Sequence, residues 1–239
     1  ITLRLMSAIH SPPSGPVRPQ SYDFSFRSYH DGIGAVGFFL GNPEHAVGEW
    51  PPAPMMLRAD AWVEGWRQKM AARIETTIGG AEGAIAAALI TGVRAGIPED
   101  ISEALTVVGL YHVISISGLH MALVAGTLMV ALRFGFALAP SFSLRRPVKK
   151  YAAAVALLAT ALYLFISGSD VAAQRAFIML AVMLVAVICD RAALTMRNLA
   201  ISAIIILALA PHEVVGPSFQ MSFAATAALV AAFGAWSAR

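Results

Sequence analysis

The sequence contains few charged residues and almost no cysteine. Of its 239 residues only 13% are Asp, Glu, Lys or Arg, while 58% are hydrophobic. Soluble domains have about 25% charged and about 45–50% apolar residues, so a disordered chain and an ordinary soluble domain are both excluded. What remains is a polytopic membrane protein. The single cysteine, Cys189, cannot form an internal disulfide. Cysteine content therefore does not indicate whether the protein lies in an oxidising or a reducing compartment.

The chain begins at Ile1, with no signal-peptide pattern, and we expect it to be a piece of a longer protein. Its net charge of +3 is explained by the positive-inside rule, because four cations gather in one loop, 140–150. They are Arg145, Arg146, Lys149 and Lys150. Charge alone therefore does not indicate a nucleic-acid ligand.

The first 53 residues are rich in turn formers, including Pro12, Pro13, Gly15 and Pro16. Short apolar stretches lie between these breakers, one of them around Phe24 and Phe26. Alternation with frequent breakers predicts strands and loops. We expect residues 1–53 to be the C-terminal part of a small β-rich domain.

The segment 54–80 changes to a helical period, and Gly79 and Gly80 end it. Its apolar positions recur at three- and four-residue steps: Met55, Ala59, Trp62, Trp66, Met70 and Ile74. This pattern predicts an amphipathic connecting helix. Trp62 and Trp66 would suit a membrane interface, and packing on the preceding domain is an equal alternative.

Residues 81–239 form the predicted transmembrane domain, an α-helical bundle. Pro98 with the following acids predicts a helix start, and a half-helix at 104–116 is expected to break at Ser117–Gly118. Five apolar stretches, each about one span long, follow: 119–139, 150–167, 172–189, 193–210 and 218–236.

Loop charges predict the orientation of these spans. Loop 140–150 and the turn 190–197 carry cations, whereas the turns at 168–171 and 211–217 carry acids. The basic side is the expected cytoplasmic side, which places loop 140–150 in the cytoplasm and residues 1–82 outside.

Ser117 and His120 are helix neighbours. A hydroxyl beside an imidazole suggests a nucleophile and base, but no nearby carboxylate would orient the ring. A polar pore lining or hydrogen bonds that hold the bundle together are the alternatives. His112 and His120 are too few to indicate a metal site.

Arg175 is the most informative polar residue, because a charge near the start of an apolar span should face the bundle interior or water. Snorkelling to the outer interface is the other option. An interior Arg175 could hold a passing phosphate or pair with Asp170. Gln174 precedes it, and Gln220 and Ser222 are predicted interior donors in the last span.

Four stretches in order resemble the competence region of the ComEC-type family, bacterial inner-membrane proteins that pass single-stranded DNA into the cytoplasm during natural transformation. The most specific runs from Gly109 to His120, GLYHVISISGLH. The others are AALITGVR followed by GIP, QRA at Gln174 with Met179, and Pro211 followed by FQMSF from Phe219. Val93 and Ser218 depart from the family pattern, where Asp and Gly are common.

The resemblance implies a channel component in the bacterial inner membrane, with an extracytoplasmic OB-like portion at residues 1–53. The partners that it implies are single-stranded DNA, the lipid bilayer, and other competence proteins such as a DNA receptor, a cytoplasmic motor or single-stranded-DNA-binding proteins. Assembly into a homo-oligomer is a further option. No cofactor, metal or catalytic residue is expected. The family's metallo-β-lactamase-like nuclease domain has no counterpart motif here, and we expect no enzyme activity. The channel-lining candidates are His112, Ser115, Ser117, Gly118, His120, Gln174, Arg175, Gln220 and Ser222.

Three alternatives remain. An intramembrane serine hydrolase would use Ser117 and His120, and a small-solute transporter would need two similar halves. The N-terminal portion could itself bind DNA, with half-buried strand residues as the plainer interpretation. The candidate contacts are Tyr22, Phe24, Phe26, Arg27 and Tyr29.

Overall fold

The structure is a computed structural model. It describes residues 3–4, 8–16, 18, 23–30, 32–39, 44–45, 54–110, 114, 117–138 and 146–237. The chain divides into two compact units, Ile1–Ala53 and Pro54–Arg239. Each unit is described by itself.

The N-terminal unit contains two antiparallel strand pairs and one helix. Strand β1 (Leu3–Arg4) pairs with β4 (Glu44–His45), and β2 (Ala8–Ser11) pairs with β3 (Val36–Phe39). Neither described sheet has more than two strands. The OB-like β domain therefore stays a prediction.

The strand predicted around Phe24 and Phe26 is wrong, because helix α1 spans Phe24–His30. Asp23 explains the helix: its carboxylate accepts hydrogen bonds from the amide (2.9 Å) and hydroxyl (2.6 Å) of Ser25, which is the role of an N-cap. The bond from the Ser25 hydroxyl holds the pKa of Asp23 below its usual 3.8. The N-cap at Asp23 thus favours a helix although the apolar residues alternate as in a strand.

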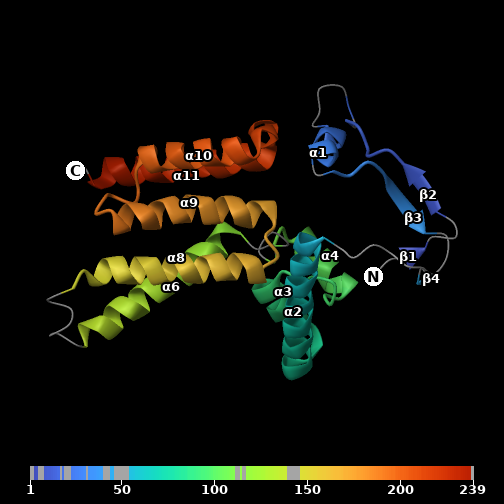
Figure 1. Ribbon diagram of the computed structural model, residues 1–239, viewed down its shortest axis with the longest axis horizontal. Coiled ribbons are helices and arrows are strands. Elements are labelled where there is room, and N and C mark those ends of the chain that lie inside the picture. Colours follow the sequence, from blue (N-terminus) through green and yellow to red (C-terminus); the bar gives the residue numbers. More distant parts are fainter. Residues whose placement is uncertain are drawn as a thin grey trace. The chain divides into compact units, whose positions relative to one another are not determined.

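The second unit begins with a helical hairpin. Helix α2 (Met55–Ile78) ends at Gly79, whose φ of 76° suits glycine, and α3 (Gly80–Thr91) packs against it. Small side chains permit the close approach, since Ala71 of α2 and Ala84 of α3 are both buried. Figure 1 shows α2 lying across the direction of the bundle helices.

The buried face of α2 differs from the predicted apolar face. Trp62 and Trp66 are 66% and 54% exposed within this unit. Their rings meet edge to face, with the ring centroids 5.9 Å apart. Ala71 faces α3 instead. Two uncovered indoles on a helix that lies across the bundle fit the membrane-interface alternative.

The helix start at Pro98 is confirmed: α4 spans Glu99–Val107. It ends before Gly109 (φ 72°), so the half-helix predicted at 104–116 ends earlier than expected. Of residues 111–116 the structure describes only Ile114, which is helical. The break before Gly118 is where predicted, and α6 (Gly118–Ala137) begins there.

The bundle consists of α6 and five later elements. They are α8 (Val148–Ile166), α9 (Val171–Ile188), α10 (Met196–Leu209), the 3-10 turn η1 (Pro211–Val215) and α11 (Pro217–Ser237). Helix α9 contacts α6, α8 and α10, and α10 contacts α11. Figure 1 shows α9 between α8 on one side and α10 with α11 on the other.

Four described helices, rather than the predicted five, are long and apolar enough to cross a membrane: α6, α8, α9 and α11. The expected span 193–210 is the 14-residue α10, which is only about 21 Å long at 1.5 Å per residue. Thr195 caps its start by accepting from the Asn198 amide, and η1 follows its end. The predicted span therefore included residues 193–195 and 210, which lie outside the helix.

The bundle core is built from small residues. Ala152, Ala153 and Ala156 of α8 are fully buried, so α8 can approach α6 and α9 closely. Ala153 and Ala156 form one cluster with Ala125 of α6 and with Leu184 and Val187 of α9. Close contact between helix backbones is a usual source of stability among membrane helices.

Candidate functional site

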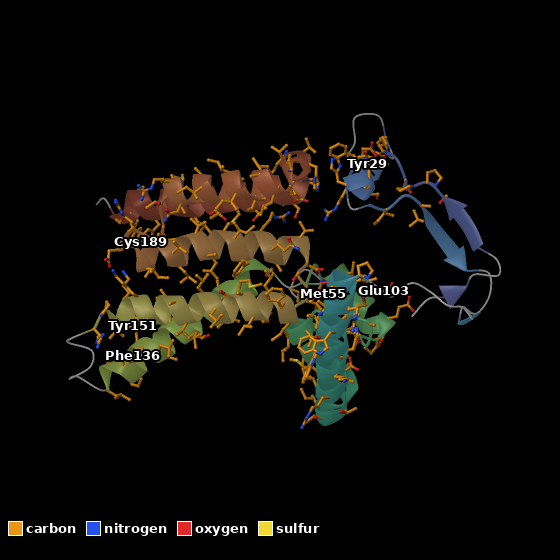
Figure 2. The ribbon with its side chains drawn as sticks, in the orientation of Figure 1. Tyr29, Met55, Glu103, Phe136, Tyr151 and Cys189 are labelled. Atoms are coloured by element: carbon orange, nitrogen blue, oxygen red, sulfur yellow. The ribbon has the colours of Figure 1, made fainter. Side chains whose placement is uncertain are left out.

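The two ends of the bundle carry different charged side chains. At one end the salt bridge Lys150–Asp190 (2.5 Å) joins the start of α8 to the end of α9, near the exposed cations Arg146, Arg191 and Arg197. We call this the basic end; Figure 2 places the side chains of Phe136, Tyr151 and Cys189 there. The opposite end, where α8 meets α9 and where η1 lies, is the polar end.

At the polar end a buried ion pair links α9 to η1. Arg175 Nη1 donates to Glu213 Oε2 at 2.7 Å, and the two side chains are 6% and 7% exposed. Arg175 Nη2 also donates to the Ser218 hydroxyl. The interior position predicted for Arg175 is confirmed, and the side chain does not snorkel to the outer interface.

The sequence around Glu213 explains its placement. Pro211 starts the 3-10 turn after α10 ends, and Gly216 and Pro217 stop it before α11. The short turn carries Glu213 inward, where it is 6% exposed. Ser218, in the first turn of α11, supplies a second acceptor for Arg175.

The alternative pairing of Arg175 with Asp170 is wrong, since Asp170 binds Arg94 Nη2 at 3.2 Å. One nitrogen of Arg175 stays unused: Nε is buried and has no hydrogen-bond partner among the described residues. A buried donor without a partner costs about 1–3 kcal/mol. This group can therefore take an acceptor at little further cost in desolvation.

Ser117 and His120 form a helix cap. The Ser117 amide donates to His120 Nδ1 at 3.3 Å, and the Ser117 hydroxyl lies 3.3 Å from the same nitrogen. This is the reciprocal geometry of a capping box, with His at the position usually held by Glu or Gln. No carboxylate of the described chain contacts the ring, so the orienting group that a hydrolytic triad needs is not found in that part.

Ser117 and Arg175 lie near the same level of α9 but on different sides of it. Met121 of α6 packs with Ala173, and a Cβ placed on Gly118 would lie 3.6 Å from the Ala176 Cβ. One residue turns a helix by roughly 100°, so Arg175 lies roughly 100–160° around α9 from those two alanines. The capped start of α6 and the Arg175 ion pair thus face different neighbours.

The two candidate glutamines are exposed within this unit. Gln174 donates to the Ser169 carbonyl at 2.6 Å, and Gln220 donates to the Val214 carbonyl at 3.1 Å. The interior position predicted for Gln220 is therefore not observed, because its amide folds back onto η1. Ser222 is half-buried. His112 and Ser115 lie outside the described residues.

The N-terminal candidates gather on one helix. Phe24, Phe26 and Tyr29 of α1 are 54%, 42% and 80% exposed, and Arg27 is on the same helix. Half-buried strand positions, the plainer expectation, are not what the structure has. Tyr22 lies outside the described residues, so the group predicted to contact DNA is only partly described.

One interaction was not predicted from the sequence. Arg67 of α2 donates from Nε to the Thr91 carbonyl (3.2 Å) and the Ile166 carbonyl (3.1 Å), and from Nη2 to Thr91 (3.0 Å). It also pairs with Glu64. A cation at the C-termini of two helices satisfies unpaired carbonyls and opposes the helix dipoles. In sequence, Arg67 was one of several cations on the polar face.

Comparison with known proteins supports one assignment. The family model described as Competence protein matches residues 89–239, which confirms the sequence resemblance over α6 to α11. No curated protein and no solved structure shows a match to the chain. Among the described residues no group of three or more His, Cys, Asp or Glu side chains could hold a metal ion.

Proposed function

Because the chain belongs to the competence protein family, which supports a broad role in competence or DNA uptake, we propose that it forms part of an inner-membrane channel for single-stranded DNA. The DNA enters the cytoplasm during natural transformation. The observation that carries the proposal is the family match over the bundle, 89–239.

A conduit for a polyanion needs water, hydrogen-bond donors and cations along its wall. The polar end offers a cation and hydrogen-bond donors in Arg175, whose Nε has no partner among the described residues, and in Ser218. Arginine binds phosphate through several N–H groups in one plane. A DNA phosphate that reaches Arg175 competes with Glu213 for the guanidinium, so contact is transient, as passage of a strand requires.

We place the path on the Arg175 side of α9 rather than beside Ser117. The start of α6 is already occupied by its own capping box, which supports a structural role for Ser117 and His120. Arg175 is held by η1 and α11, on which Gln220 and Ser222 also lie. His112 and Ser115 stay predictions for the path.

The orientation follows from loop charge. The basic end faces the cytoplasm under the positive-inside rule, and the polar end and residues 1–82 face outward. Incoming DNA, handed over by a receptor, meets the polar end first, while a motor or single-stranded-DNA-binding protein receives it inside. In this proposal the chain conducts DNA and any strand cleavage belongs to another domain.

The test is import of labelled DNA into cells that carry the protein with Arg175→Met and Glu213→Leu together. Replacing a buried ion pair by apolar residues of similar size is often nearly neutral for stability, so the protein should reach the membrane at normal levels. We expect surface DNA binding to persist and internalisation to fall at least about tenfold.

A matched control removes the other described interhelical ion pair of the bundle, with Lys150→Met and Asp190→Leu at the basic end. This variant should import DNA at a rate near that of the wild type. Normal import by the Arg175/Glu213 variant, at normal membrane level, would show that the pair only holds helices together.

A further inference from the structure

A groove between α9 and α10 combines an apolar wall with two cations at one end. Its volume is about 500 Å³, within the usual range of small-molecule sites. The apolar wall is formed by α9 from Phe177 to Ala186, including Ala181, and by Ile201 and Ile205 of α10. At the connection between α9 and α10 the groove is lined by Arg191, Arg197 and Asn198.

Both arginines are available to a ligand. Each is exposed, and no carboxylate of the described chain pairs with either guanidinium. The neighbouring Asp190 binds Lys150. Arg191 and Arg197 therefore bring two uncompensated positive charges to one end of an apolar surface.

The backbone of the loop that joins the arginines is held in place. The Asn198 side chain donates to the carbonyls of Ala192 (2.9 Å) and Ala193 (2.7 Å), which fixes the loop between them. The Arg191 amide donates to the Ala186 carbonyl at 2.7 Å. Because the amide protons of Asn198 are used by the loop, the two guanidinium groups are the donors left for a ligand.

We propose that this groove binds one anionic phospholipid, with its phosphate held by Arg191 and Arg197 and an acyl chain along α9 and α10. The apolar run from Phe177 to Ala186 is about 14 Å long at 1.5 Å per residue. A headgroup phosphate matches the planar guanidinium donors, and basic pockets between membrane helices are a known kind of site for anionic headgroups. Neither a free phosphate nor an apolar chain alone uses both halves of the groove.

The experiment is native mass spectrometry of the purified chain in detergent, titrated with phosphatidylglycerol or with phosphatidylcholine of the same acyl chains. The wild type should bind one phosphatidylglycerol in preference to phosphatidylcholine. The variant Arg191→Gln/Arg197→Gln should lose about 30-fold in affinity for phosphatidylglycerol, because each basic residue near an anionic headgroup contributes roughly a factor of five.

Two further variants separate charge from shape. Arg146→Gln/Lys149→Gln removes the same charge from exposed positions at the same end but outside the groove, and should bind within about twofold of wild type. Ala181→Trp fills the apolar wall without changing charge and should lower phosphatidylglycerol binding as well. A thermal melt in the same detergent checks that each variant is folded.

Four outcomes overturn the proposal: no preference for phosphatidylglycerol, an equal loss in the Arg146/Lys149 control, unchanged binding by folded Ala181→Trp, or displacement of the lipid by an equal concentration of inorganic phosphate. A wild-type dimer that Ala181→Trp dissociates would instead assign the groove to a second copy of the chain.

Discussion

Replacing Gly168 by alanine should detach Arg67 from the two helix ends that it holds. Gly168 lies in the turn after α8 with a φ of 91°, in the left-handed region that side chains disfavour. A Cβ there would overlap the Arg67 guanidinium. The substitution thus acts twice, through the backbone of the turn and through the contact between α2 and the bundle.

The two contributions can be separated by size. Left-handed backbone costs a non-glycine residue roughly 1–2 kcal/mol. Displacing Arg67 breaks bonds to Thr91 and Ile166, but the displaced guanidinium regains hydrogen bonds to water. We therefore take the net loss as that of one hydrogen bond to a charged group, about 1.5–3 kcal/mol. We expect Gly168→Ala to cost about 3–5 kcal/mol in the wild type, but only about 1–2 kcal/mol in an Arg67→Ala background.

The measurement is a double-mutant cycle on Gly168→Ala and Arg67→Ala, using reversible unfolding of the purified chain in mixed micelles. A coupling energy of about 2–3 kcal/mol is expected. Arg73→Ala, which changes an exposed cation on the same helix, is the control and should not couple to Gly168. Additive costs for Gly168 and Arg67 would refute the attachment of α2 through Arg67.

Three further outcomes are expected. Ser117→Ala should lower stability by about 1 kcal/mol through the lost cap and His120→Gln should keep it, whereas a fluorophosphonate adduct at Ser117 would revive the hydrolase alternative. In proteoliposomes, lipids brominated near the headgroup should quench Trp fluorescence, and changing Trp62 and Trp66 together to Phe should lower that quenching; unchanged quenching would favour packing on the preceding unit. The pKa of Asp23 is lowered by its hydrogen bonds, so its cap on α1 is fully present above pH 3.8 and is lost as pH falls below that value; amide exchange in α1 should accelerate over that acidic range, and pH-independent protection would contradict the cap.

Three helix boundaries of the second unit were predictable from the sequence, because local signals determine them. Gly79 ends α2, Pro98 precedes α4, and Ser117 precedes α6, in each case through backbone preferences of the residue itself or a cap. Local signals also misled: Phe24 and Phe26 alternate like a strand, but the cap at Asp23 favours a helix.

The partners of charged residues were not readable. Arg175 was placed in the interior correctly, since desolvation alone requires it. Its partner Glu213 is distant in sequence and was considered only as the acid of the turn 211–217. Arg67 resembled any other cation on a polar helix face. Pairing depends on which turns meet at one end of the bundle, and sequence spacing carries no information on that.

The separation between Arg175 and Glu213 has a consequence for biosynthesis. The two residues are 38 positions apart, with α10 between them. At about 5–20 residues per second, the ribosome takes roughly 2–8 s to make Glu213 after Arg175. During that interval α9 carries an uncompensated guanidinium, whose transfer into lipid is costly. Lateral release of α9 from the translocation machinery should therefore wait until η1 has emerged, so that α9, α10 and η1 enter the bilayer as one unit.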